Sequence, residues 1–461
     1  MLNLMGQQLE MIRTDDSSIN FLQNLNIDRP GLPGASLPWL NALRQNSKDL
    51  FIDIGLPTQK MEGWKYTSLK PLEDAGFRPA NDDDGLVSIE QVPPLLPELD
   101  EVPRLVFVNG RLQSSFLTQK GLPDGVYLDH LSNILNEMPG WAEKHLGKVA
   151  DANGLPLVQL NTAMMDTGYV LRVGSGLVVE KPIEIIFIGG VTDNSIAYFP
   201  RNLIVLEDGA KATVVEHHTC IGSAGSYLSN MVTEITLGAS SNLSHYKVQA
   251  ESKDAIHLGS VQALVASDAK YDSFTLSIGG RLSRNEILVQ LNGSGAYAGV
   301  SGGYLMRGNE HCDNTTTIEH LVPDTSSREV FKGVLDDQSR AVFQGRIVVH
   351  KDAQRTDGHQ LCKTLLLSSG AEMDAKPELE IFADDVKCSH GATTGQIDES
   401  ALFYLRSRGI PEAHARNLLV QSFLAEALEE IPQEDMKKAM SNKILHWLPA
   451  SCYLSEEWRE T

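Results

Sequence analysis

The central part of the chain, from about residue 157 to residue 394, is a long series of short β-like runs. These runs are rich in Val, Ile, Leu and Thr, and Gly, Asp, Asn and Ser separate them. Segments of this composition, bounded by turn-forming residues, are typical of β-strands. No helical pattern of convincing length interrupts the series, so the pattern predicts a mainly β core.

Some turns between these runs resemble one another at a nearly constant spacing. Their alanines, Ala210, Ala239, Ala269 and Ala296, are 29, 30 and 27 positions apart, and Ala353 follows 57 positions later, about twice that step. A β-only repeat of this length favours a solenoid, in which neighbouring coils bury each other's inner faces. On spacing alone, a β-sandwich or a propeller with evenly spaced turns is the alternative.

Helical patterns precede this core. Apolar residues three and four positions apart predict helices over residues 1–70 and another helix over residues 129–146, with a short strand at residues 105–108. An Asp- and Pro-rich stretch over residues 82–103 predicts a solvated, extended connector. We assign residues 1–150 to an N-terminal helical region that includes this connector, and residues 151–396 to the β core.

The remaining residues, 397–461, predict a C-terminal helical domain. Asp398 suits the N-cap of a helix that ends at Gly409, and Pro411 suits the first turn of the next helix. A third helix is expected over residues 433–447. The second helix carries an apolar stripe, and such a stripe packs more often on its own chain than on a partner. The stripe consists of Leu419, Val420, Phe423, Leu424, Ala427, Leu428 and Ile431.

Composition and charge argue for a folded protein and against two classes of partner. Of 461 residues, 42% are hydrophobic and 21% are charged, which is close to the usage of soluble globular proteins. The formal net charge of −21 repels phosphate backbones and anionic lipid, so we expect no nucleic-acid and no membrane partner. No run of 18 consecutive apolar residues occurs, so we expect no transmembrane helix.

The cysteines and the amino-terminal sequence bear on the compartment. Five widely scattered cysteines are an odd number, which does not suit the disulfide framework of a secreted protein. The first residues show no basic segment followed by an apolar run, so no secretory signal is expected. A reducing, cytoplasmic location is the prediction.

Candidate chemistry is confined to four Cys/His groupings. The chain has no G-x-x-x-x-G-K-[ST] motif, so we do not expect it to hydrolyse ATP by itself. Alternate residues of a strand share a face, so the adjacent His217 and His218 point apart, whereas Cys388 and His390 project to one side. The groupings are Glu216-His217-His218 with Cys220, His311-Cys312-Asp313 with His320, Cys362 near His359, and Cys388-Ser389-His390.

The pair Cys388 and His390 therefore predicts a metal site on a strand. A thiolate and an imidazole suit zinc, iron or an iron–sulfur unit, although a free cysteine is more often a small buried apolar residue. An iron–sulfur cluster takes about four protein ligands, and two side chains cannot complete that set. Either distant residues such as Cys362 fold beside the pair, or a second polypeptide supplies the remaining ligands across an interface.

Several segments resemble the SufD branch of the SufB/SufD family, which belongs to the SUF iron–sulfur cluster assembly system. The longest is RTDGHQLCKTLLLSSGAEMDAKPELEIFADDVKCSHGATTGQIDESALFYLRSRGI, residues 355–410. The segments GLPTQKMEGWKYTSL (residues 55–69), VFVNGR, AKATVVEHH and CDNTTTIEH also fit the family pattern. The resemblance covers nearly the whole chain and is loosest in the first fifty residues and in the acidic connector.

This resemblance implies a right-handed parallel β-helix (solenoid) flanked by helical regions, and a complex with two partners. One partner is a SufB-like paralogue. It would share a nascent iron–sulfur cluster, or iron, with Cys388 and His390. The other is a SufC-like ABC ATPase that docks on the C-terminal helices, where the candidate docking residues are Phe403, Tyr404, Arg406 and Arg408. A flavin is implied at the level of the complex.

The expected function is that of a non-enzymatic scaffold subunit that helps to assemble iron–sulfur clusters. A SufB-like main scaffold is the first alternative. SufB-like chains carry a Cys-rich motif near the amino terminus, and here the first cysteine is Cys220. A β-helix enzyme acting on acidic polysaccharide is the second, and the net charge argues against it. Identical coil edges would also allow a homodimer when the partner is absent.

Overall fold

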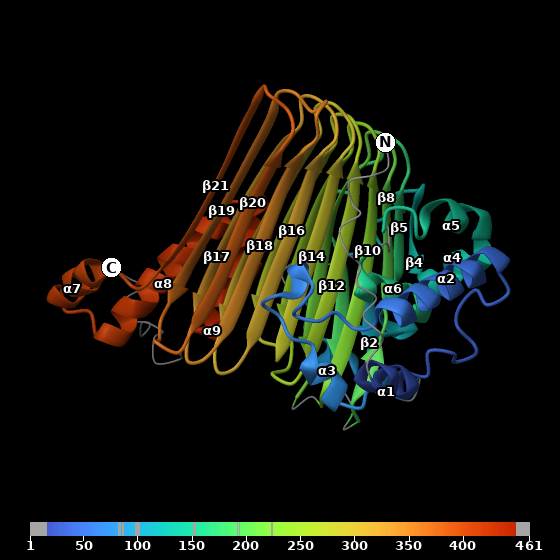
Figure 1. The fold of residues 1–461 in the computed structure, drawn as a ribbon, viewed down its shortest axis with the longest axis horizontal. Helices are drawn as coiled ribbons and strands as arrows, with labels where there is room; N and C mark the ends of the chain where they lie inside the picture. The colour runs from blue at the N-terminus through green and yellow to red at the C-terminus, as the bar shows by residue number, and fades with distance from the viewer. Residues whose placement is uncertain are drawn as a thin grey trace.

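The computed structural model describes residues 16–81, 84, 87–96, 102–150, 154–190, 192, 194–222 and 225–448. Two long, mainly parallel β-sheets form the body of the molecule, and helices lie at both ends of the chain (Figure 1). The prediction of a mainly β parallel solenoid with flanking helices is therefore confirmed.

Sheet A and sheet B are built from alternate strands of the chain. Sheet A has the spatial order β20 (Glu372–Ile381), β18 (Arg340–Val349), β16 (His311–His320), β14 (Leu282–Leu291), β12 (Ile256–Val265), β10 (Tyr227–Leu237), β8 (Arg201–Leu206), β5 (Tyr169–Val173) and β4 (Val126–His130), with β1 (Arg78–Pro79) and β7 (Ile196–Tyr198) beside it. Sheet B has the order β21 (Val386–Gly395), β19 (Thr356–Leu366), β17 (Ser326–Leu335), β15 (Tyr297–Met306), β13 (Lys270–Ile278), β11 (Asn242–Ala250), β9 (Lys211–Cys220), β6 (Ile183–Gly189), β2 (Arg104–Val108) and β3 (Arg111–Leu112).

Each coil of the solenoid adds one strand to each sheet. Within the described residues, the pairs β5/β6, β8/β9, β10/β11, β12/β13, β14/β15, β16/β17, β18/β19 and β20/β21 make eight coils. Apolar side chains from the two inner faces, such as Phe187, Ile235, Leu243 and Val289, pack into one continuous buried cluster. Burial of these faces by the neighbouring coils stabilises strands that could not fold alone.

The repeat is confirmed, but two of its alanines, Ala239 and Ala353, do not occupy the position equivalent to Ala210; in two later coils that position is held by Thr325 and Thr356. The backbone N–H of Asn242 donates to the carbonyl of Ala210, and that of Lys270 donates to Ser241. The residue of the second coil that corresponds to Ala210 is therefore Ser241, two positions after Ala239. Small residues can occupy several positions of such a turn, so their spacing alone does not fix the register.

The N-terminal region contains the predicted helices and additional strands. Its helices are α1 (Asp16–Leu25), α2 (Pro38–Ile54), α3 (Lys70–Asp74), α4 (Leu131–Glu137), α5 (Pro139–His145) and α6 (Pro156–Met164). The single helix expected over residues 129–146 is wrong. The segment starts in β4, and the helix breaks at Pro139, which cannot donate the backbone hydrogen bond that would continue α4. The nine-residue α6 also lies at the start of the segment predicted to be β.

The expected solvated connector is only partly exposed in the part that the structure describes: Ser88, Glu90 and Gln91 are exposed, whereas other residues are buried. Asp84 is 8% exposed and forms an ion pair of 2.6 Å with Arg78. Leu95 and Leu96 are buried, and the carboxylate of Glu184 accepts their backbone N–H groups. Prolines and aspartates suggested exposure, but their neighbours pack on the first coils. Asp82, Asp83, Pro97 and Cys452, as well as residues 1–15 and 449–461, lie outside the described residues.

The C-terminal helices are α7 (Glu399–Ser407), α8 (Glu412–Leu428) and α9 (Glu434–Trp447), as the sequence predicts. The Asp398 carboxylate accepts the backbone N–H of Ser400 at 2.8 Å, which caps α7, and Gly409 follows with a left-handed φ of 87°. The apolar stripe packs on its own chain, as expected. Its buried residues contact the outer face of sheet B, through Val248, Phe274 and Val334 among others. None of the helices in the described ranges is long and apolar enough to cross a membrane.

Candidate functional site

The last coil leaves two strand edges unpaired. Among the described strands, β21 pairs with β19 and β20 pairs with β18, and no further strand covers either of them (Figure 1). The unpaired N–H and C=O groups of such edges are ready to bind another strand. The end of the solenoid that carries β20 and β21 is therefore suited to pairing with a second β-rich chain.

Both residues of the predicted site lie on β21, at this open end. Cys388 is the register neighbour of Gly358, and His390 is the register neighbour of Gln360, which points into the solenoid. Cys388 is half-buried and packs beside an apolar cluster that includes Ile347. His390 is exposed. Neither side chain is sealed inside the chain, so both are accessible to a molecule that covers the last coil.

The chemistry of Cys388 favours the protonated thiol in the isolated chain. Burial raises its pKa above the ordinary value, the carboxylate of Asp357 raises it further, and the backbone N–H of Gly358 lowers it. Metal binding requires the thiolate, so a metal ion that binds here would have to displace this proton. In the part of the chain that the structure describes, no group of three or more His, Cys, Asp or Glu side chains is arranged to hold a metal ion.

Cys362 is not brought to this pair. It is 1% exposed, it contacts the hydroxyl of Tyr304, and burial raises its pKa to about 12. Its register neighbour on β21 is Ala392, further along the strand than the pair. The sequence left two sources for the remaining ligands, residues such as Cys362 or a second polypeptide. The prediction that Cys362 lies beside the pair is therefore wrong.

His359 lies on the opposite face of β19 from Cys362, so the two do not form one site. Its Nδ1 lies 2.7 Å from the hydroxyl oxygen of Ser389, and its Nε2 lies 2.7 Å from the carboxylate of Asp357. All three side chains are exposed on the outer face of the last two coils. This row of polar groups borders the Cys388 and His390 pair from outside.

The other two Cys/His groupings are also divided between faces. His217 points outward, where its Nδ1 lies 3.0 Å from the carbonyl of Pro93, whereas His218 points inward and lies 3.1 Å from Glu216. This separation agrees with the strand geometry predicted from the sequence. In the grouping His311-Cys312-Asp313 with His320, Cys312 is fully buried inside the solenoid. The outward His311 contacts Thr67, and the buried His320 contacts Thr325 and Ser327.

A buried polar network inside the solenoid was not predicted. The ammonium of Lys247 lies 2.7 Å from Nε2 of His257, whose Nδ1 lies 2.9 Å from Glu251. Burial lowers the pKa of His257 to about 4, so its ring is neutral and its Nε2 can accept a hydrogen bond from the ammonium of Lys247. Lys247 lies on β11, His257 lies on β12, and Glu251 lies in the turn between them, so the turn from sheet B to sheet A brings the three together.

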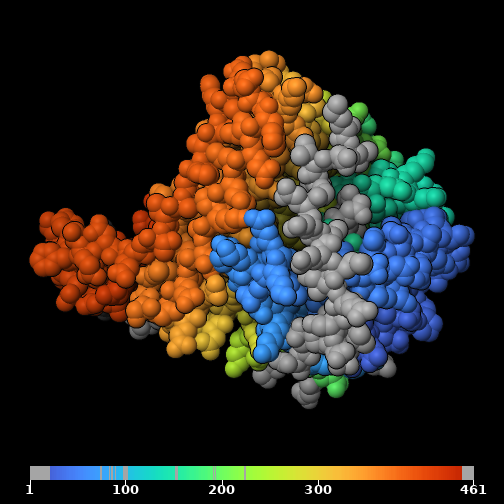
Figure 2. Space-filling model, viewed as in Figure 1, coloured from blue at the N-terminus to red at the C-terminus, as the bar shows by residue number. Residues whose placement is uncertain are grey.

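The candidate docking residues are exposed on α7 and on its C-cap residue Arg408, and α7 projects from the solenoid (Figures 1 and 2). Phe403 is 72% exposed and Tyr404 is 57% exposed. The guanidinium of Arg408 lies 5.2 Å from the centre of the Tyr404 ring, and Arg406 pairs with Glu412 at 3.4 Å. Exposed aromatic and arginine side chains of this kind are enriched at the energetic centres of protein interfaces.

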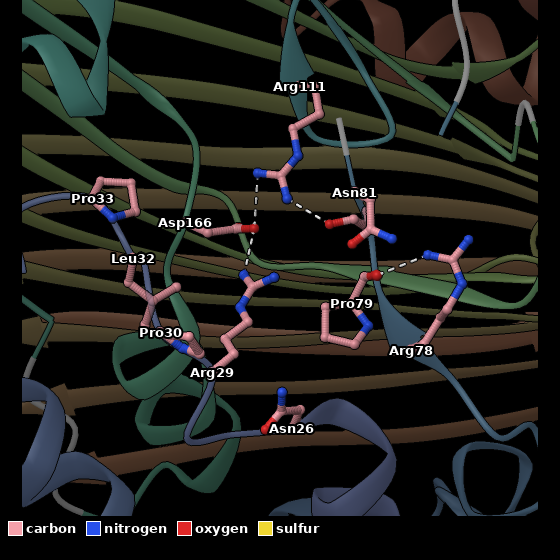
Figure 3. A pocket seen from close by; sticks show the side chains of 12 residues that line it. Asn26, Arg29, Pro30, Leu32, Pro33, Arg78, Pro79, Asn81, Arg111 and Asp166 are labelled. Carbon is pink, nitrogen blue, oxygen red and sulfur yellow. Dashed lines mark hydrogen bonds and ion pairs between the residues drawn. The ribbon is translucent and has the colours of Figure 1, made fainter. Parts of the chain in front are cut away.

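A polar cavity of about 640 Å³ lies far from this site, between the N-terminal region and the first coils (Figure 3). Arg29 and Arg111 point toward Asp166, whose Oδ2 they contact at 2.6 and 3.0 Å. Arg78 on the opposite wall is held by Asp84. These ion pairs tie the N-terminal segments to the solenoid, and we assign the cavity no role in the chemistry of the last coil.

Comparison with known proteins agrees with this architecture. Residues 188–423 match the family model described as "SUF system FeS cluster assembly, SufBD core domain". Residues 18–185 match the model described as "SufBD protein N-terminal region". The chain belongs to the SufBD family. The family resemblance predicted from the sequence is thereby confirmed, and the core model includes the solenoid strands from β8 to β21.

Relatives within the SufBD family span most of the chain. The chain is 34% identical to "Iron-sulfur cluster assembly protein SufD" of Escherichia coli K12, over 86% of this chain and 90% of the relative. It is 31% identical to an iron–sulfur cluster assembly SufBD family protein of Synechocystis, over 84% of this chain and 87% of the relative. A SufD of Bacillus subtilis is 25% identical over 88% of this chain and 93% of the relative.

Proposed function

We propose that this SufBD family chain is a SufD-like, non-enzymatic scaffold subunit that assembles iron–sulfur clusters together with two partners. A SufB-like paralogue would cover the open end of the solenoid. A SufC-like ABC ATPase would dock on the C-terminal helices and supply the nucleotide-binding motif that this sequence lacks. The named SufD relatives in two bacteria support the assembly role.

One observation carries the proposal. Cys388 and His390 are accessible at the unpaired edge of the last coil, and the described part of this chain offers no complete metal site. A thiolate and an imidazole supply half of the ligands that a cluster requires. The remaining ligands would come from the paralogue that pairs with β20 and β21. Shared ligation also eases release, because separation of the two chains leaves the cargo with an incomplete set of ligands.

The position of α7 supports the second partner. Its aromatic residues Phe403 and Tyr404 are exposed, whereas α8 and α9 are anchored to the solenoid. Lys332 of β17 pairs with Glu426 of α8, and Arg328 of β17 pairs at 2.8 Å with Glu430, which lies just after α8, so this end of α8 is tied to β17. A movement that an ATPase imposes on these helices would therefore be transmitted to the coils that precede the candidate site.

Reconstitution separates a shared scaffold from a SufB-like scaffold that acts alone. The purified chain, the paralogue and their complex are each treated with iron and sulfide without oxygen, and the visible spectrum of each is recorded. We expect charge-transfer absorption that depends on His390 only in the complex. A stable cluster on this chain alone would contradict the proposal. An unchanged cluster yield in a complex that carries His390→Ala would contradict it as well.

A further inference from the structure

Gln360 lies on the inner face of β19, between a buried acid and the candidate site. The strand register places it beside Glu329 of β17 on one side and beside His390 of β21 on the other. Gln360 is 3% exposed and Glu329 is 1% exposed. The two are joined by a hydrogen bond of 2.7 Å from Nε2 of Gln360 to Oε2 of Glu329.

The carboxylate of Glu329 determines how the Gln360 amide is oriented. Oε2 of Glu329 accepts a hydrogen bond from the NH2 group of the amide. The amide oxygen is thereby turned away from Glu329. Gly345 leaves space for this arrangement, because a Cβ at that position would lie 1.9 Å from Nε2 of Gln360.

The oxygen of Gln360 has no donor. Its Oε1 is buried, and no hydrogen-bond partner for it is found among the described residues. A buried acceptor without a partner is destabilising, so such an atom in a folded protein requires an explanation. The next residue in the same inward-facing column of sheet B is His390, whose ring carries an N–H group that can serve this oxygen.

We propose that Gln360, oriented by Glu329, is a positioning residue for His390. In this arrangement Oε1 of Gln360 accepts the N–H of one imidazole nitrogen and so fixes the tautomer of the ring. The lone pair of the other nitrogen is then directed toward the cargo iron. Histidines that bind metals commonly donate their second N–H to a carbonyl or carboxylate, which orients the ring. The inference rests on the function proposed for His390.

The test replaces Gln360 by a side chain of similar size that has no acceptor. The full chain is labelled with 15N at histidine, and the imidazole nitrogen shifts of His390 are assigned by comparison with His390→Ala. We expect one tautomer in the parent protein and a mixture of tautomers in Gln360→Met. In cells, we expect cluster maturation by Gln360→Met to fall about 10-fold or more, as for other residues that orient metal ligands.

Gln249 provides a matched control. It is fully buried on β11, and its Oε1 also has no partner in the described structure, but it lies in a coil remote from His390. Gln249→Met should leave the His390 signals unchanged. Circular dichroism and gel filtration show whether Gln360→Met folds. If it does not, the tautomer of His390 is measured in Glu329→Met instead. This second variant keeps Gln360 but frees its amide to rotate, so the tautomer mixture should appear again.

Three results would overturn the inference: a tautomer mixture in the parent protein, unchanged His390 signals in the folded variants, or an equal change in Gln249→Met. Failure of the inference differs from failure of the proposed function. If His390→Ala abolishes cluster maturation while Gln360→Met changes neither the His390 nitrogen shifts nor maturation, only the inference about Gln360 is contradicted. If His390→Ala matures clusters normally, the proposed function falls, whatever the tautomer of the ring.

Discussion

The guanidinium of Arg284 lies 3.9 Å from the centre of the Trp64 ring, so a residue of the N-terminal region is stacked on the outer face of β14. The neighbouring residues continue this contact across sheet A. Gly63 accepts a hydrogen bond from Gln344 of β18, and Glu62 pairs with Lys376 of β20 at 2.8 Å. This segment, residues 62–67, therefore crosses the outer face of sheet A and contacts strands of several coils, including β20 of the last coil (Figure 2).

Removal of the Trp64 ring should destabilise the protein strongly. Trp64 is 6% exposed, and truncation of a buried tryptophan to alanine typically costs about 3–5 kcal/mol. We expect Trp64→Ala to lower the free energy of unfolding in urea by about that amount. The exposed neighbour Lys65 is the control, and Lys65→Ala should stay within about 0.5 kcal/mol of the parent. Similar losses in the two variants would show that the stacking on Arg284 is unimportant.

The role of His390 can be separated from that of an exposed histidine nearby. His390→Ala should leave folding and partner binding intact while cluster maturation in cells is lost, because the imidazole supplies one ligand to the cargo. His359→Ala is the matched control, since His359 is exposed on the adjacent strand but faces the outer surface. Normal maturation in the first variant, or equal loss in both, would remove the predicted site.

Docking of the ATPase should depend on the aromatic patch of α7. We expect Phe403→Ala combined with Tyr404→Ala to weaken co-purification with the ATPase at least 10-fold, because exposed aromatic anchors dominate the energy of such contacts. The thermal stability of the chain alone should change little, since both side chains are exposed. Val178 is 41% exposed near the first coils, and Val178→Ala serves as the control. Undiminished co-purification of the double variant would place the docking surface elsewhere.

The buried carboxyl of Glu329 should make stability depend on pH. Burial raises its pKa from 4.5 to about 7, against the opposing effects of the Thr316 hydroxyl and the Gln360 amide. A carboxyl with a raised pKa in the folded state costs stability as the pH rises, because the unfolded chain ionises more readily. The loss begins near pH 4.5 and is complete above pH 7, and a shift of this size corresponds to about 3 kcal/mol.

Glu329→Gln cannot ionise and should not show this loss. The difference in unfolding free energy between Glu329→Gln and the parent should therefore grow in favour of the variant between about pH 4.5 and pH 7. Urea titrations at several pH values measure this difference. The exposed Glu372→Gln is the control and should differ from the parent by less than about 0.5 kcal/mol throughout. A constant difference for Glu329→Gln would show that Glu329 ionises as readily in the folded state as in the unfolded chain.

Local patterns in the sequence were sufficient for several features of the fold. The runs of β-branched residues indicated the strands, and Asp398 and Gly409 marked the two ends of α7 correctly. The alternation of a strand also placed Cys388 and His390 on one face. These features depend on the period of the backbone and on the nearest neighbours along the chain, which the sequence displays directly.

Other features depend on which coil lies beside which. The sequence suggested an exposed connector, yet Asp84 and Leu95 are buried, because partners remote in sequence cover them. Nothing local connects Gln360 with Glu329, since their contact arises only when the parallel strands β19 and β17 pair in register. Backbone periodicity thus determined the strands and the face of the predicted site. The stacking of coils, which depends on long-range burial of the inner faces, decided what surrounds that site.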